Sequence, residues 1–135
     1  MNNCIFCKII KGEIPATKVY EDEHTLAFLD IKPVNPGHTL VIPKEHYENF
    51  LHVESGALQR LIVSVQKVAK AVSQGLGCEG LNLGLNNGTA AGQVVPHVHF
   101  HIMPRTPTDG YQLWHGKPYE AGQMEGVASK IRLAM

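Results

Sequence analysis

Hydrophobic residues recur with a helical period in one long segment of the chain. Over residues 55–74 they are spaced three and four apart and form a single stripe, made of Leu58, Leu61, Ile62, Val65, Val68, Ala69 and Val72. Ser55 can cap the start of this helix, and Gly75 and Gly77 can end it. The pattern therefore predicts one long amphipathic helix that buries one face.

Strand-like patterns lie on both sides of this helix. Short β-branched, aromatic or alternating runs occupy residues 18–20, 25–29, 38–42, 81–85 and 97–103. Pro104 is expected to end the last strand. A short apolar helix is expected at residues 4–10, and another in the tail at 126–133. This order of elements predicts an antiparallel α+β fold.

The length and composition suit one globular domain. The chain has 135 residues, 44% of them hydrophobic and 18% charged, so we expect a single domain with a core at about 4–105 and a tail at 106–135. Twelve basic side chains balance twelve acidic ones, so neither nucleic acid nor a membrane surface is an expected partner. No secretory signal or apolar stretch of membrane-spanning length is visible, which favours a cytoplasmic protein.

Three histidines alternate near the end of the core. If residues 97–103 form a strand, His97, His99 and His101 share one face, about 6.6 Å apart along the chain. Three imidazoles beside a core are costly unless each finds a partner. A solvated strand face would explain one such histidine, but three in strict alternation disfavour that explanation. Two functional ones stay open: a metal-binding strand, or a nucleophile that forms a phosphoryl adduct close to the glycine-rich loop at 86–93.

The cysteines offer a second candidate site. Cys4 and Cys7 have the spacing of half a tetrahedral zinc site, which alone is a weak signal, and reduced structural thiols are the alternative. A redox dithiol is disfavoured because no βαβ pattern surrounds the pair. Cys78 has no obvious partner and is expected to be a free thiol.

Several of these segments together resemble one known family. Residues 92–103, Gly-Gln-Val-Val-Pro-His-Val-His-Phe-His-Ile-Met, resemble the signature of the histidine triad (HIT) proteins, His-φ-His-φ-His-φ-φ with φ apolar. The resemblance extends through residues 5–10, 27–31 and 38–44. It implies a bent antiparallel sheet with one long helix and a short N-terminal helix, and a homodimer whose sheet crosses the interface. It also implies a nucleotide hydrolase or transferase that acts on a phosphoramidate or a dinucleoside polyphosphate.

The resemblance assigns roles to individual residues. His99 would attack the α-phosphorus and carry the nucleotide, while His101 and Gln93 would contact the phosphate or the leaving group. The nucleotide pocket would be made by Asp30, which would bind the ribose, together with Ile5, Phe6, Phe28, Ile31, Asn86 and Gly92. Structural zinc would be held by Cys4, Cys7, His46 and His97, and no organic cofactor is implied.

Alternatives remain beside these assignments. Phe6, Phe28 and Ile31 also suit ordinary core positions, and His38 suits packing better than catalysis. Val94 stands where many family members carry Ser or Thr, which removes a hydroxyl contact near the phosphate. Other functions to separate are a zinc-stabilised nucleotide-binding protein with little catalysis, a hydrolase with zinc on all three triad histidines, and nucleotide transfer to an acceptor other than water.

Overall fold

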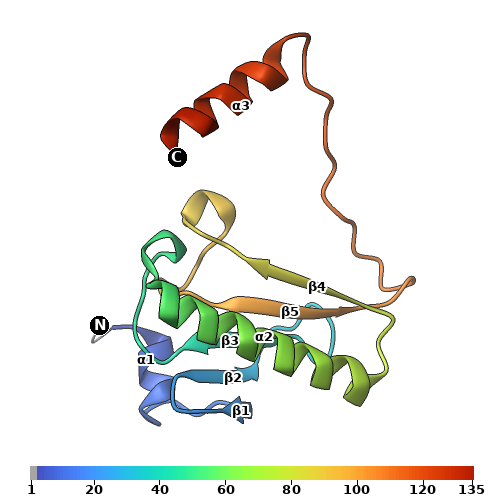
Figure 1. The fold of residues 1–135 in the computed structure, drawn as a ribbon. Helices are drawn as coiled ribbons and strands as arrows, with labels where there is room; N and C mark the ends of the chain where they lie inside the picture. Colours follow the sequence, from blue (N-terminus) through green and yellow to red (C-terminus); the bar gives the residue numbers. More distant parts are fainter. Residues whose placement is uncertain (1–2) are drawn as a thin grey trace.

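The computed structural model describes residues 3–135 (Figure 1). Its elements are α1 (Ile5–Ile10), β1 (Lys18–Glu21), β2 (Thr25–Leu29), β3 (Thr39–Pro43), η1 (Phe50–His52), α2 (Ser55–Leu76), β4 (Gly80–Leu85), η2 (Thr89–Ala91), β5 (Phe100–Arg105) and α3 (Gln123–Ala134). The strands form one antiparallel sheet in the order β1-β2-β3-β5-β4. The predicted α+β fold with one long helix and a short N-terminal helix is therefore confirmed. No helix among residues 3–135 is long and apolar enough to cross a bilayer.

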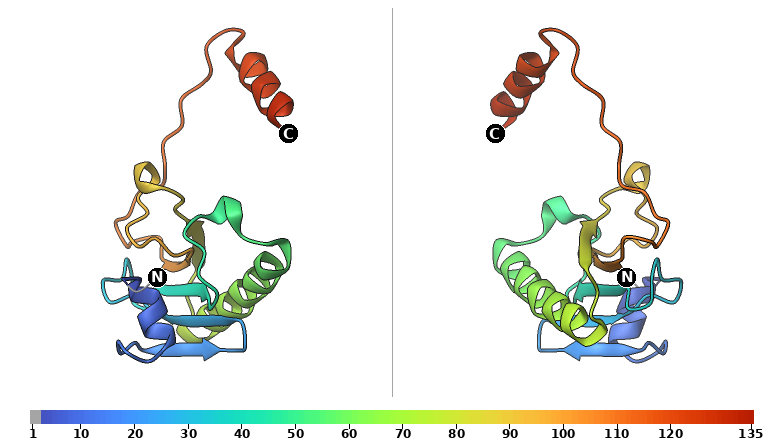
Figure 2. Two further views of the ribbon diagram at one scale, coloured as in Figure 1. Left: turned by 90° about the vertical axis from the view of Figure 1, so that its left-hand side faces the viewer. Right: turned by 90° about the vertical axis from the view of Figure 1, so that its right-hand side faces the viewer.

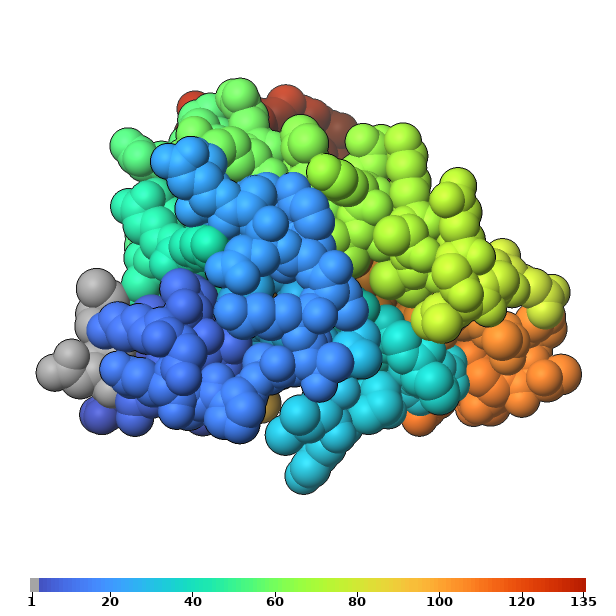
Figure 3. Space-filling model, turned by 90° about the horizontal axis from the view of Figure 1, so that it is seen from below, coloured from blue at the N-terminus to red at the C-terminus, as the bar shows by residue number. Residues whose placement is uncertain are grey.

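The alternation of side chains along the strands builds a separate core on each face of the sheet. Ala27 and Val41 point to the face that α2 covers, where they pack with Leu61. Phe28 and Leu40 point to the opposite face and pack against α1. In Figure 3, which views the molecule from below, α1 (dark blue) lies beside the β1–β2 hairpin (lighter blue). The two faces therefore have different neighbours: a long helix on one side and a short helix with loops on the other.

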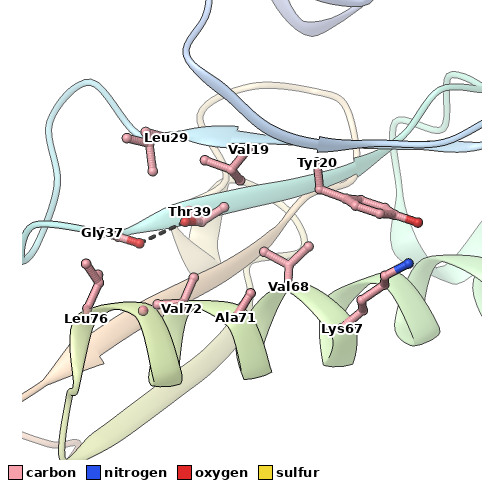
Figure 4. A pocket seen from close by; sticks show the side chains of 11 residues that line it. Val19, Tyr20, Leu29, Gly37, Thr39, Lys67, Val68, Ala71, Val72 and Leu76 are labelled. Carbon is pink, nitrogen blue, oxygen red and sulfur yellow. Dashed lines mark hydrogen bonds between the residues drawn. The ribbon is translucent and has the colours of Figure 1, made fainter.

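The long helix agrees with its sequence pattern except at its start and at Ile62, which was expected on the buried stripe but is 47% exposed. Ser55 is its first residue, and Glu54 takes the cap position without a side-chain hydrogen bond, so the predicted Ser55 cap is wrong. Gly77 ends the helix in the left-handed conformation, as expected, while Gly75 stays inside it. A hollow of about 460 Å³ remains between α2 and β1–β3, with Lys67 over the Tyr20 ring (Figure 4). It lies on the α2 face, away from the triad histidines.

The strand predicted at 97–103 is shifted along the chain. β5 begins at Phe100, because both neighbouring strands have their last paired residue there and the Val98 N–H donates to the Tyr47 carbonyl instead. The strand also continues through Pro104, which pairs with β4 beyond the last β5 residue that pairs with β3. One side of β5 has no strand neighbour at that point, which is where a sheet tolerates proline.

The tail leaves the body and ends in a helix of its own. Residues 106–122 extend away from the sheet, and α3 lies apart from the other elements in all three ribbon views (Figures 1 and 2). The helix predicted at 126–133 is therefore present and somewhat longer. None of its residues is buried.

Candidate active site and metal centre

A cavity of about 410 Å³ lies on the α1 face of the sheet. It brings together most of the residues proposed for nucleotide binding and catalysis: Ile5, Phe6, Phe28, Asp30, Ile31, Asn86, Gly92, His99 and His101. They come from α1, from β2 and the residues just after it, from the loop after β4, and from β5 and the segment leading into it. Residues far apart in the sequence therefore meet around one space, whose size falls within the range of about 300–1,000 Å³ for small-molecule pockets.

The apolar wall of the cavity is built around Phe6. Its ring packs edge-on against Phe28 and His99, with centroids 5.4 and 5.1 Å away. Phe6 and Phe28 are buried, so they serve the core as well as the cavity. Ile31 is different: it is 93% exposed, so its suggested core role is wrong and it stands at the rim.

The hydrogen bonding of His99 fixes which ring nitrogen is free. Its Nδ1 lies 2.7 Å from the His97 carbonyl oxygen, which can only accept, so Nδ1 carries the proton. The lone pair is therefore on Nε2. Burial lowers the pKa of His99 from its ordinary value, against the opposing effects of the His97 carbonyl and Asp30, so the ring stays neutral near pH 7. A neutral imidazole with a free Nε2 is the nucleophilic form.

His101 is oriented by His38, for which the sequence favoured a packing role. The Val34 N–H donates to His38 Nδ1, so the neutral His38 ring carries its proton on Nε2 and donates it to His101 Nδ1, 2.9 Å away. His101 must then carry its own proton on Nε2. The expected packing role of His38 is therefore incomplete. Leu40 pairs with His101, which places His38 on the same face of the adjoining chain, but a single sequence does not reveal that register.

Asp30 lies close enough to both rings to suggest another metal group. The ligand atoms of Asp30, His38 and His101 all lie within 4.8 Å of one another. A metal on His38 Nε2 would require the proton to move to Nδ1, where it would face the Val34 N–H. The arrangement therefore fits a hydrogen-bonded pair of imidazoles better than a metal site. Burial, aided by the neighbouring His99 and His38, lowers the pKa of His101 to about 4.

Gln93 points its amide into its own loop. Its Oε1 accepts from the Gly88 N–H at 2.8 Å, and its Nε2 donates to the carbonyls of Glu48 and Val95 at 3.0 and 3.1 Å. All these partners are backbone groups of the loops beside the cavity. In this conformation Gln93 holds the glycine-rich loop in place, and a contact between its amide and a phosphate stays a prediction.

The first triad histidine belongs to a separate cluster with the cysteines. The ligand atoms of Cys4, Cys7, His46 and His97 all lie within 4.8 Å of one another. His97 Nδ1 lies 3.4 Å from Cys4 Sγ and 3.6 Å from Cys7 Sγ, and His46 Nδ1 lies 3.1 Å from His97 Nδ1 and 3.3 Å from Cys7 Sγ. Such spacings match the edges of a tetrahedron around a metal with bonds of about 2.0–2.3 Å.

The protonation of His97 also fits a metal ligand. Its Nε2 lies 2.8 Å from the Pro43 carbonyl oxygen, so Nε2 carries the proton and the Nδ1 lone pair points at the cysteines and His46. Burial, with help from His46 and His99, lowers the pKa of His97 to about 4, which keeps the ring neutral. Two sulfurs and two ring nitrogens form a closed donor set that suggests zinc in a structural role. Because His97 faces the cysteines, the three triad histidines do not converge on one metal.

The sequence is similar to known proteins of one family. The model of the HIT domain matches residues 11–108. An uncharacterized HIT-like protein of Methanocaldococcus jannaschii is 58% identical over 107 residues, which are 79% of this chain and 82% of that protein. The adenosine 5′-monophosphoramidase hnt1 of Schizosaccharomyces pombe is 42% identical over 132 residues, 96% of each chain. The adenylylsulfatase HINT3 of Arabidopsis thaliana is 43% identical over 108 residues, 80% of this chain and 55% of that protein.

Solved structures give the same family. A HIT-family crystal structure from Bacillus subtilis has a TM-score of 0.92 at 44% identity and covers 98% of this chain and 97% of that chain. A Streptococcus mutans structure reaches 0.94 at 41% identity, covering 99% and 86%. A zinc-bound histidine triad protein from Mycobacterium smegmatis reaches 0.78 at 34% identity, covering 99% of each chain. With the family model over most of its length and close relatives in both sequence and structure, this chain belongs to the HIT family.

Proposed function

We propose that this protein hydrolyses a nucleoside monophosphate joined to a second group, through a nucleotide held covalently on His99. The observation that carries the proposal is the free Nε2 of a neutral, buried His99 at the wall of a nucleotide-sized cavity. Relatives named adenosine 5′-monophosphoramidase and adenylylsulfatase support a substrate in which adenylate is bonded to nitrogen or to a sulfate oxygen.

In the first step, His99 Nε2 forms a bond to the α-phosphorus while the bond to the leaving group breaks. The leaving group takes the electron pair of that bond and is protonated as it departs. Nδ1 keeps its proton, so the adduct carries positive charge on the ring. The His97 carbonyl, 2.7 Å from Nδ1, stabilises that charge.

In the second step, a water oxygen attacks the same phosphorus and the phosphorus–nitrogen bond to Nε2 breaks. The electron pair returns to Nε2, water loses a proton, and the nucleoside monophosphate leaves. A positively charged imidazole is a good leaving group, which is why one difficult displacement becomes two easier ones. If another hydroxyl or amine replaced water, the same intermediate would give a transferase.

The neighbouring residues would position the substrate. The proton on His101 Nε2 can hydrogen-bond a phosphate oxygen or the leaving group, and His38 holds the ring for that contact. The carboxylate of Asp30 suits the two ribose hydroxyls. The base would lie among Ile5, Phe6, Phe28 and Ile31, with Asn86 and Gly92 beside the phosphates.

Two further features belong to the same proposal. We propose that Cys4, Cys7, His46 and His97 hold zinc, which would tie α1 to the segment that carries the nucleophile. When bound, the metal would supply cross-linking and no activated water, because all four positions are filled by protein. We also propose a homodimer formed through the edge strand β4, whose outer backbone groups have no strand neighbour among residues 3–135.

The proposal is tested by nucleoside monophosphate release from a panel of adenosine 5′-monophosphoramidate, adenylyl sulfate, diadenosine polyphosphates and a nucleotide sugar. The parent should release product from at least one compound, and His99→Ala should lose that release while keeping its circular dichroism spectrum. Equal release by both proteins would rule out His99 as nucleophile. Nucleotide binding without turnover would favour the alternative, a zinc-stabilised nucleotide-binding protein.

A further inference from the structure

The face of the sheet that α2 covers carries a hollow of its own, separate from the nucleotide cavity. This α2 hollow has a volume of about 460 Å³ and lies between α2 and strands β1–β3 (Figure 4). Of the residues 3–135 that line either space, Leu29 alone lines both. The volume falls within the range of about 300–1,000 Å³ for small-molecule pockets, so the α2 hollow has room for a ligand that does not touch the triad histidines.

Most of the wall of the α2 hollow is apolar. Val19 of β1 and Leu76 of α2 are large apolar side chains that are 50% and 55% exposed, and Val72 lies between α2 and the sheet (Figure 4). The hydroxyl of Thr39 is already bonded, because it donates to the Gly37 carbonyl at 2.8 Å. This part of the wall therefore suits a hydrocarbon, which gains free energy when its surface leaves water.

One end of the α2 hollow is positively charged. The Lys67 ammonium lies there, 4.8 Å from the centre of the Tyr20 ring. Both residues also line a neighbouring hollow of about 340 Å³, which contains Arg60. Arg60 and Lys67 are seven residues apart and therefore lie on one face of α2. Neither forms an ion pair with any of residues 3–135, so both charges are available to an anion.

The carboxylate in the neighbouring hollow does not neutralise these charges. Asp22 Oδ2 accepts from the hydroxyls of Tyr20 and Ser64 at 2.7 and 3.3 Å. Its Oδ1 accepts from two backbone N–H groups of the β1–β2 turn at 2.8 and 2.7 Å. Both oxygens are therefore engaged in holding the turn and in fixing Tyr20, which forms part of the wall.

The length of the α2 hollow limits the length of a ligand. Lys67 and Leu76 are nine residues apart on α2, which is about 13 Å at 1.5 Å per residue. An extended hydrocarbon chain of about ten carbons covers the same distance. Leu76 closes the far end, because its side chain packs directly on Gly37 and leaves no room there even for a Cβ.

We propose that the α2 hollow binds a medium-chain fatty acid, with about ten carbons along Val72 and Leu76 and the carboxylate on the Lys67 ammonium. Burial of the hydrocarbon supplies most of the affinity, and the charged end fixes the orientation. Arg60 adds positive charge beyond the carboxylate. The site does not depend on the proposed function, because the proposed catalytic and nucleotide-binding residues do not line it.

The test titrates decanoate into the full-length protein by calorimetry, with methyl NMR spectra recorded in parallel. We expect saturation at one decanoate per chain. The methyl signals of Val72 and Leu76 should shift, and those of Ile5 and Ile14, which line the nucleotide cavity, should not. Octanoate should bind about fivefold more weakly, because two methylenes fewer leave water. Decyltrimethylammonium, a cation with the same chain length, should bind at least about tenfold more weakly.

Two variants make the same change of charge on different sides of α2. Lys67→Glu reverses the charge in the α2 hollow and should raise the Kd of decanoate about tenfold. Lys70→Glu is the matched control, because Lys70 is exposed on the same helix and does not line the hollow. It should stay within about twofold of the parent, since salt screens an exposed charge at that distance. Circular dichroism checks that both variants fold.

Each other outcome would overturn the proposal. Heat and shifts that do not saturate would mean that the hollow holds no fatty acid. Shifts at Ile5 and Ile14 would place decanoate in the nucleotide cavity instead. Equal affinity for the cation and the carboxylate would indicate a purely apolar contact, and equal effects of the two substitutions would remove Lys67 from the site. The titration of the parent with the three compounds decides the matter even if Lys67→Glu fails to fold.

Discussion

Removal of the metal is the perturbation that best separates a structural from a catalytic zinc site. The four proposed ligands join α1, the chain after β3 and the segment before β5, and Cys4 and His97 are 93 residues apart. Zinc should therefore bind the native fold and not the unfolded chain, and its removal should lower the free energy of unfolding. Loss of the cross-link should also loosen Phe6, which lies between the two cysteines and packs on His99.

The magnitude follows from mass action. With free zinc at about 100 times its Kd, binding to the native state contributes about 2.7 kcal/mol, and at about 1,000 times about 4.1 kcal/mol. A chain of 135 residues lies between the size classes for which 1 kcal/mol shifts Tm by about 2–4 and 4–8 °C. Chelation should then lower Tm by roughly 10–15 °C, and nucleotide affinity should fall with it.

The assay is thermal unfolding of the parent, Cys7→Ser and Cys78→Ser, each with zinc and with a chelator. Cys78 is a matched control because it is a free thiol outside the cluster. The parent and Cys78→Ser should lose the same number of degrees on chelation, whereas Cys7→Ser should start low and change little. A parent whose Tm ignores the chelator would refute the structural site. Activity lost at once with Tm unchanged would instead indicate a catalytic metal.

Three further predictions rest on other contacts. Burial lowers the pKa of His101 to about 4 and also lowers the pKa of His38, so between pH 6.5 and about 4 the unfolded chain binds more protons than the folded protein. The free energy of unfolding, measured with urea, should therefore be constant above pH 6.5 and fall as the pH drops through that window. A rise in that window would contradict the assignment. His38→Phe should lower kcat about tenfold to a hundredfold with a smaller change in KM, because His101 loses the donor that orients it; unchanged kinetics would show that the pair is only structural. Gly37→Ala should lower the free energy of unfolding by about 2–4 kcal/mol in chemical denaturation, because Gly37 has a φ of 96° and a Cβ there would collide with Leu76. Leu76→Ala should remove part of that cost. Losses that simply add in the double variant would contradict the contact.

The sequence predicts best those structural features that depend only on residues within one helix or strand. The stripe on α2 and the αL residue Gly77 are local features; Gly77 is confirmed, and so is the stripe except at Ile62, which is exposed. The segment at 97–99 was misjudged because its alternation suits a strand, while the hydrogen bond that takes it out of the sheet comes from Tyr47, about fifty residues away in the chain. Strand ends of this kind depend on partners that a single sequence does not name.

The candidate site likewise combines signals that are local in the sequence with contacts that only the fold creates. The spacing of Cys4 and Cys7 is a local signal for half a zinc site, but His46 and His97 were identified only through the family resemblance, and the fold then brings them within reach. The contact of His38 with His101 depends on register between strands and was missed. The loop-bracing hydrogen bonds of Gln93 depend on the path of two loops, which no motif specifies.

The most direct test of the central claim is to trap the nucleotide on the protein. The parent and His99→Ala are mixed with adenosine 5′-monophosphoramidate in a single turnover, quenched in base to preserve the phosphorus–nitrogen bond, and analysed by peptide mass spectrometry. The account predicts one adenylyl group on His99 in the parent, appearing before adenylate is released, and none in the variant. Product formation with no adduct on His99, or continued turnover by a folded His99→Ala protein, would contradict it.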